Sequence, residues 1–164
     1  MLQNLSLLIA RELDALQREV ELYPSDEALW ATVPGLPNAG GTLVLHLAGN
    51  LRHFIGGLLG HTGYVRDRDA EFNRRGATRS ELLLLVESAR REVAQALAGV
   101  SPEQLDARFP QAVGGRAMST GLFLQHLLAH LAYHLGQIDY HRRASTGNAA
   151  SANALPLAPL GDPA

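Results

Sequence analysis

Residues 126–143 read HLLAHLAYHLGQIDYHRR, and this leucine-rich stretch predicts a long helix that carries four histidines. His126, His130 and His134 follow one another at intervals of four residues, and His141 comes seven residues later. Side chains three or four residues apart share one face of a helix. Because each buried imidazole needs partners for its polar nitrogens, this stripe either contacts water or holds a ligand.

Apolar residues at steps of three and four predict that the helix is one of four. Thr42 is a suitable N-cap for the second helix, and Thr78 forms a capping box with Glu81 at the start of the third. The helix of the opening stretch starts at Ser119 or Thr120. The four helices cover approximately residues 2–23, 42–60, 78–99 and 119–145.

Four helices of this length predict an all-α fold and a four-helix bundle. The polar connection over residues 61–77 is long for a simple hairpin, which favours a crossover between the second and third helices. Its Arg66–Asp69 stretch could guard the mouth of a pocket or form surface ion pairs, and it is interpreted as forming surface ion pairs. We expect one domain over residues 1–147, followed by an Ala/Pro-rich tail over residues 148–164 that is flexible or lies on the surface.

The composition restricts the classes of function. With 164 residues, a net charge of −2 and 14 scattered arginines as the only fixed basic side chains, the sequence indicates neither a nucleic-acid partner nor an anionic membrane. It has no long apolar run and no basic leader, so a cytoplasmic location is expected. The chain contains no cysteine, so any thiol chemistry needs an external thiol.

Two of the predicted helices combine an apolar seam with a polar one. In the helix of residues 42–60, the polar seam contains Thr42, His46, Asn50, His53 and Gly57. In the helix of residues 119–145, it contains His126, His130, His134, Gln137 and His141. If these two edges face each other, the bundle encloses a pocket lined with histidines.

Three neutral imidazoles from two helices can hold a divalent cation and leave one position open. Spacing alone allows either His130 with His134 or His126 with His130 as the pair on one helix, with His46 as the third ligand. The alternative is that these histidines are edge residues bonded to water and backbone. His53 and His141 are interpreted as surface residues.

Three blocks of the sequence resemble the DinB/YfiT-like superfamily of metal-binding four-helix bundles, and in particular a bacterial branch of it. The blocks are TLVLHLAGNLRHFIG, GYVRDRDAEF and HLAYHLGQIDYHRR, and the resemblance covers roughly residues 1–145. It implies an up-down-down-up topology and a homodimer. The ligand pattern of the family selects His46, His130 and His134, and leaves His126 one turn away as a pocket residue.

The resemblance also implies a function. Characterised relatives include transferases and an isomerase that use low-molecular-weight thiols such as bacillithiol or mycothiol. We therefore expect a metal-dependent S-transferase that acts on small electrophiles in detoxification or stress response, with zinc or nickel as the metal. The alternatives are a metal-dependent hydrolase and a non-catalytic metal-binding scaffold. Neither polar seam carries a carboxylate as general base, while Asn50 and Gln137 are candidates to orient a ligand or a bound water.

Overall fold

The computed structural model describes residues 2–161, and its regular structure is helical. The α-helices are α1 Leu2–Glu21, α2 Gly40–Leu51, α3 Arg68–Asn73, α4 Arg79–Ala98, α5 Pro102–Asp106 and α6 Thr120–Thr146. Tighter or wider turns occur at η1 Glu27–Trp30, η2 Arg52–Gly57 and η3 Ala158–Leu160, and η2 is a π-helical turn that extends α2. Within residues 2–161 there is no extended strand, so the predicted all-α class is confirmed.

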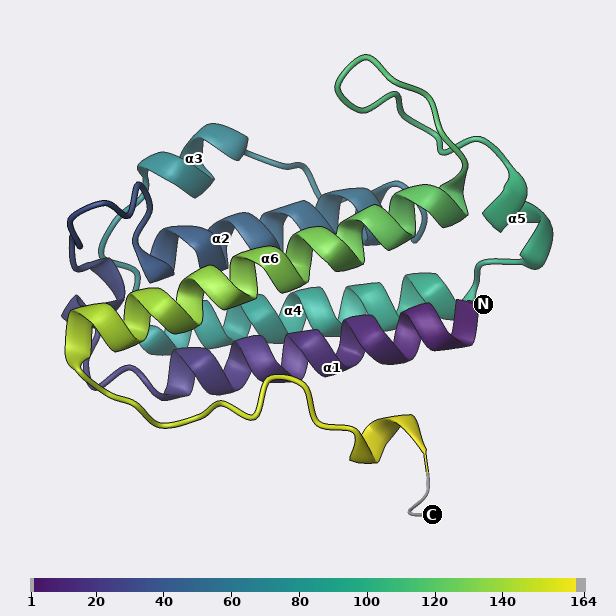
Figure 1. Cartoon of the computed structure of the whole chain (residues 1–164). Helices are drawn as coiled ribbons and strands as arrows, with labels where there is room; N and C mark the ends of the chain where they lie inside the picture. Colours follow the sequence, from purple (N-terminus) through teal and green to yellow (C-terminus); the bar gives the residue numbers. More distant parts are fainter. Residues whose placement is uncertain (1, 162–164) are drawn as a thin grey trace.

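The core lies between four long helices, α1, α2, α4 and α6 (Figure 1). Both α1 and α2 pack against α4, and both also pack against α6. Each long helix buries a stripe of apolar side chains at helical spacing, and Leu16, Leu47, Leu82 and Leu131 are representatives with no measurable exposure. Burial of these stripes, rather than helix propensity, holds the helices side by side.

The start of α2 differs from the sequence-based prediction. The helix begins at Gly40 after Ala39, so the prediction of Thr42 as its N-cap is wrong, and Thr42 is buried inside the helix. The two glycines pass closely under aromatic side chains. A Cβ atom on Gly40 would collide with the hydroxyl of Tyr23, and one on Gly41 would lie 2.8 Å from the indole of Trp30. Glycine therefore allows the helix to begin in a space too narrow for other residues.

The ends of α4 and α6 follow the local rules of capping. Thr78 accepts a hydrogen bond from the backbone of Glu81, whose side chain bonds back to Thr78, so the predicted capping box is confirmed. Ser119 is the N-cap of α6, as its hydroxyl accepts a bond from the backbone of Leu122. At the other end, Gly147 adopts a left-handed conformation with φ of 70°, which ends the helix.

The connection from α2 to α4 contains the short helix α3, which lies against α2 (Figure 1). The segment after α6 turns back and runs beside α1 (Figure 1). Arg18 donates to the carbonyl of Ala152 over 2.7 Å, and Arg142 donates to the carbonyls of Asn148 and Ala150. Among the described residues, no helix combines the length and apolar character needed to cross a bilayer.

Candidate metal centre

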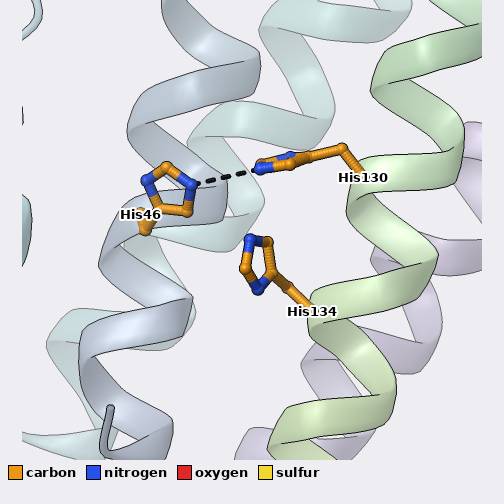
Figure 2. Close-up of side chains that lie close together, drawn as sticks. All are labelled: His46, His130 and His134. Carbon is orange, nitrogen blue, oxygen red and sulfur yellow. Dashed lines mark hydrogen bonds between the residues drawn. The ribbon is translucent and has the colours of Figure 1, made fainter. Parts of the chain in front are cut away.

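Three histidines from two neighbouring helices meet between α2 and α6. His46 comes from α2, while His130 and His134 lie one turn apart on α6 (Figure 2). One ring nitrogen from each of them lies within 4.8 Å of the others. The structure thus brings together the same three residues that the family resemblance selects. His126, the other partner that spacing allowed for His130, does not belong to the cluster.

The rings of the cluster turn their nitrogens toward one another. Nε2 of His46 lies 3.2 Å from Nε2 of His130, which is the contact marked in Figure 2. The rings of His130 and His134 meet edge to face with their centroids 4.5 Å apart. A neutral imidazole has one N–H donor and one lone pair. The pair of Nε2 atoms is therefore either bridged by one proton or directed at a shared cation.

A carboxylate behind His46 determines which of its nitrogens faces the cluster. Oε2 of Glu71 lies 3.0 Å from Nδ1 of His46, so Nδ1–H donates to the carboxylate and Nε2 keeps its lone pair. Arg66 donates to both carboxylate oxygens, over 2.6 and 2.7 Å, and this fork fixes their orientation. The Arg66 and Glu71 side chains are only 12% and 6% exposed. The ion pair is consequently poorly screened by solvent.

Gly49 gives Glu71 the space it needs. A Cβ atom on Gly49 would collide with the carboxylate of Glu71 and would lie only 2.8 Å from the Cδ atom of Glu71. The helix α3 begins at Arg68 and is capped by Asp67, whose side chain accepts a hydrogen bond from the backbone of Ala70. This cap places Glu71 in the first turns of α3, directly against the glycine in α2.

His134 has a matching partner on its own helix. Nδ1 of His134 lies 2.6 Å from Oε1 of Gln137, which can only accept a hydrogen bond. Nδ1 therefore carries the proton, and Nε2 of His134 has its lone pair available. Two of the three imidazoles are thus held in the tautomer that a metal bound through Nε2 requires.

The environment keeps His130 and His134 neutral and the Glu71 carboxylate charged. Burial, together with the charges of His134 and His46, lowers the pKa of His130 to about 4. Burial also lowers the pKa of His134, and its bond to Gln137 offsets only part of this effect. Burial alone would raise the pKa of Glu71, but Arg66 and His46 outweigh it and lower that pKa.

These residues fit a divalent metal ion. Three imidazole nitrogen donors within 4.8 Å of one another match a three-histidine set of the kind that leaves a fourth position for another ligand. The supporting hydrogen bonds from His46 to Glu71 and from His134 to Gln137 are those that metal-bound histidines make. The charges of Arg66 and Glu71 cancel, so the protein groups around the cluster leave the charge of a cation uncompensated. Such a site favours an anionic ligand at its open position.

The remaining predicted pocket residues occupy different positions. His126 is exposed, and its ring stacks on His130 with the centroids 6.2 Å apart. Asn50 is buried, and its Oδ1 has no hydrogen-bond partner within residues 2–161. Gln137 supports His134 as described above. Asn50 is therefore the only one of the three whose role is left open by the contacts of its side chain.

Interpreting His141 as a surface residue was wrong. Its exposed fraction is 1%, and its two nitrogens lie 2.8 Å from the hydroxyl of Tyr23 and 2.9 Å from the carbonyl of Ala31. These contacts connect the end of α6 to the segment after α1. His141 is thus a structural residue, and its imidazole is satisfied by the protein itself.

Arg66 and Glu71 were not predicted as part of the site from the sequence. Neither residue lies on the two polar seams, and Glu71 comes from α3, a helix of six residues. Interpreting Arg66 as part of a surface ion pair was wrong, because its guanidinium lies behind His46. The available signal was the GYVRDRDAEF block, in which Asp67 caps a helix that contains the glutamate.

The fold and the cluster define an all-α protein with a three-histidine candidate metal centre. A comparison with protein families agrees: the DinB superfamily matches residues 8–138. The match covers more than half of the chain, and the chain belongs to this superfamily. No curated protein matches it significantly.

Proposed function

We propose that the protein is a metal-dependent S-transferase that joins a low-molecular-weight thiol of the bacillithiol type to small electrophiles, in detoxification or stress response. The observation that carries the proposal is the cluster of His46, His130 and His134. Hydrogen bonds to Glu71 and Gln137 fix the tautomers of His46 and His134 in this cluster. Membership of the DinB superfamily and the absence of cysteine support it, since the thiol must then come from outside.

The residues of the chain would act by binding and orientation. His46, His130 and His134 hold one divalent cation, for which zinc or nickel suits the nitrogen donors. Such a cation lowers the pKa of a bound thiol or water and supplies a nucleophile near neutral pH. Glu71 and Gln137 keep the Nδ1 protons of His46 and His134, so that both Nε2 lone pairs stay directed at the centre.

The proposed reaction balances without a further co-reactant. The thiol sulfur forms a bond to the electrophilic carbon, and the bond from that carbon to its leaving group breaks. The leaving group departs with the bonding electron pair, and the thiol proton passes to solvent. No general base from the chain would be required, because a cation held by His46, His130 and His134 would lower the pKa of the thiol.

The direct test is a transfer assay with bacillithiol and benzyl bromide on zinc-loaded and nickel-loaded protein. We expect conjugate above the uncatalysed background, and loss of this excess in His134→Ala. His61→Asn is the matched control, since His61 is exposed, has φ of 52° and is not in the cluster. Asparagine tolerates such a left-handed conformation. Equal rates for wild type and His134→Ala, across several electrophiles, would reject the S-transferase.

Two other outcomes would identify the alternative functions. Hydrolysis of an ester or amide without added thiol, lost in His134→Ala, would indicate a metal-dependent hydrolase. A large loss of thermal stability on chelation, with no turnover of any substrate, would indicate a non-catalytic scaffold in which the metal joins α2 and α6.

We also propose the up-down-down-up order for the four long helices. The long connection that contains α3, between α2 and α4, supports this order. The colours in Figure 1 also support it, because they run in one direction along α2 and α4 and in the opposite direction along α1 and α6. Three expectations remain predictions: a homodimer, a small-molecule substrate and a cytoplasmic location. Sedimentation at several protein concentrations tests the homodimer.

A further inference from the structure

A groove of about 400 Å³ opens beside the candidate metal centre. Its walls are mainly apolar: Leu36 and Pro37 come from the loop before α2, Leu43 from α2, and Tyr133 and Tyr140 from α6. This volume lies within the range of pockets that bind small organic molecules. The groove therefore has the size of a ligand site.

Two residues of the groove also touch the metal centre. Gln137 lines the groove, and its Oε1 accepts the hydrogen bond from Nδ1 of His134. The ring of Tyr133 packs edge-on against the ring of His134 with the centroids 5.2 Å apart. The groove and the centre thus share a wall, and a molecule in the groove lies next to a residue of the histidine cluster.

The aromatic side chains of the groove are unusually open to solvent. Tyr133 is 65% and Tyr140 is 73% exposed, and Leu36 beside them is 38% exposed. Gly136, which comes between the two tyrosines in the sequence of α6, also lines the groove, and a Cβ atom at this position would meet nothing within 4 Å. The groove therefore presents two exposed phenol rings and open space at Gly136, an arrangement suited to a flat ligand.

The polar groups of the groove are neutral. Apart from the tyrosine hydroxyls, they are the side-chain amides of Asn38 and Gln137, and none of the described residues that line it carries a charge. An ionised ligand would lose hydration without gaining a charged partner, whereas an uncharged ring would bury apolar surface. An amide can still hydrogen-bond a nitro, carbonyl or hydroxyl substituent.

We propose that this groove binds the uncharged aromatic part of the substrate and holds its reactive carbon beside His134. The substrate class is thus an aromatic electrophile, and the part of the inference that concerns reaction rests on the proposed S-transferase function. Binding of the ring itself does not depend on that function. The two can therefore be tested separately.

The test uses indole, an uncharged aromatic molecule without a leaving group, and the full-length protein in the absence of thiol. Gly136→Leu adds a large side chain at a lining position of the groove where a Cβ atom meets nothing within 4 Å, and it replaces a glycine inside a helix, which favours folding. Ala144→Leu is the control, because Ala144 is exposed on the same helix outside the groove. Titrations by saturation-transfer NMR measure indole binding, and calorimetry measures zinc binding.

We expect the wild type and Ala144→Leu to bind indole, and Gly136→Leu to bind it at least about tenfold more weakly because the ring can no longer be buried. Zinc affinity should be the same in all three. Indole binding that is absent in the wild type, or equally strong in Gly136→Leu, overturns the proposal. So does a wild-type dimer that Gly136→Leu dissociates, because the groove would then be occupied by a second copy of the chain. Intact indole binding without thiol transfer rejects the S-transferase alone.

Discussion

Nδ1 of His46 lies 3.0 Å from Oε2 of Glu71, although the two residues are 25 positions apart and belong to different helices. This contact makes the short helix α3 part of the candidate metal centre. Arg66 holds the carboxylate from the other side, so the tautomer of His46 is determined before any ligand arrives. The connection between α2 and α4 thus supplies the carboxylate that neither α2 nor α6 places beside the histidines.

Removing the carboxylate should weaken metal binding. We expect Glu71→Ala to lower zinc affinity by about tenfold to a hundredfold, because His46 loses the acceptor that orients it and Arg66 is left as an unpaired positive charge nearby. Calorimetric titration measures the change. Glu87→Ala, at an exposed position of α4, is the control. An unchanged affinity in Glu71→Ala would show that the carboxylate has no part in the site.

Gly49→Ala tests the same contact from α2. Alanine stabilises an isolated helix relative to glycine by about 1 kcal/mol, but its Cβ would displace the carboxylate of Glu71. We therefore expect zinc affinity to fall about tenfold. Gly136→Ala is the matched control, since its Cβ enters open space. If Gly49→Ala binds zinc as tightly as the control, Glu71 does not depend on this close approach.

The metal-free protein should lose stability in weak acid. The pKa of His130 falls from its ordinary value of 6.5 to about 4 in the folded state, because burial and the neighbouring histidines disfavour its charged form. Between these two pH values the unfolded chain binds more protons than the folded one. The free energy of unfolding therefore decreases as the pH falls from 6.5 to 4, and this contribution is fully lost below pH 4.

Urea unfolding of chelator-treated protein at several pH values measures this dependence. His130→Gln removes the titrating group, so its stability should change less over the same interval. Other groups titrate in both proteins and cancel in the difference between the two curves. Parallel curves for the wild type and His130→Gln would contradict a depressed pKa at this position.

A second buried pair supports the end of α6. Nε of Arg142 donates to Oε2 of Glu19 over 2.6 Å, and the two side chains are 0% and 1% exposed. We expect Arg142→Met to lower the free energy of unfolding by about 3 to 5 kcal/mol, because it leaves the Glu19 carboxylate buried without its partner. Denaturant titration followed by circular dichroism measures the loss. The double variant Glu19→Leu/Arg142→Met should recover much of it, and no recovery would indicate that packing, not charge, dominates.

Local patterns in the sequence predicted most of the helical framework. The apolar spacing and the Thr78 and Ser119 caps depend on neighbouring residues, so a sequence of one chain is enough to find them. The start of α2 depended instead on the approach of Tyr23 and Trp30 to two glycines. Such tertiary contacts leave no periodic signal.

The histidine cluster was predictable in part because two of its members follow a local helical spacing. Spacing placed His130 and His134 on one face of a helix, and the family resemblance chose that pair over His126 with His130. The residues behind the cluster were not found, because Glu71 belongs to a short helix in a polar connection with no apolar periodicity. His141 was misjudged because its position at the end of an imidazole stripe does not reveal the buried Tyr23 hydroxyl that it meets.

The most direct test of the three-histidine centre is the metal content of protein purified without a nickel column, measured by elemental analysis beside a His46→Ala/His134→Ala variant. We expect close to one divalent metal ion per chain in the wild type and none in the variant. If both proteins remain free of metal after dialysis against zinc and nickel, the three histidines are not a metal centre and the proposed chemistry fails with it.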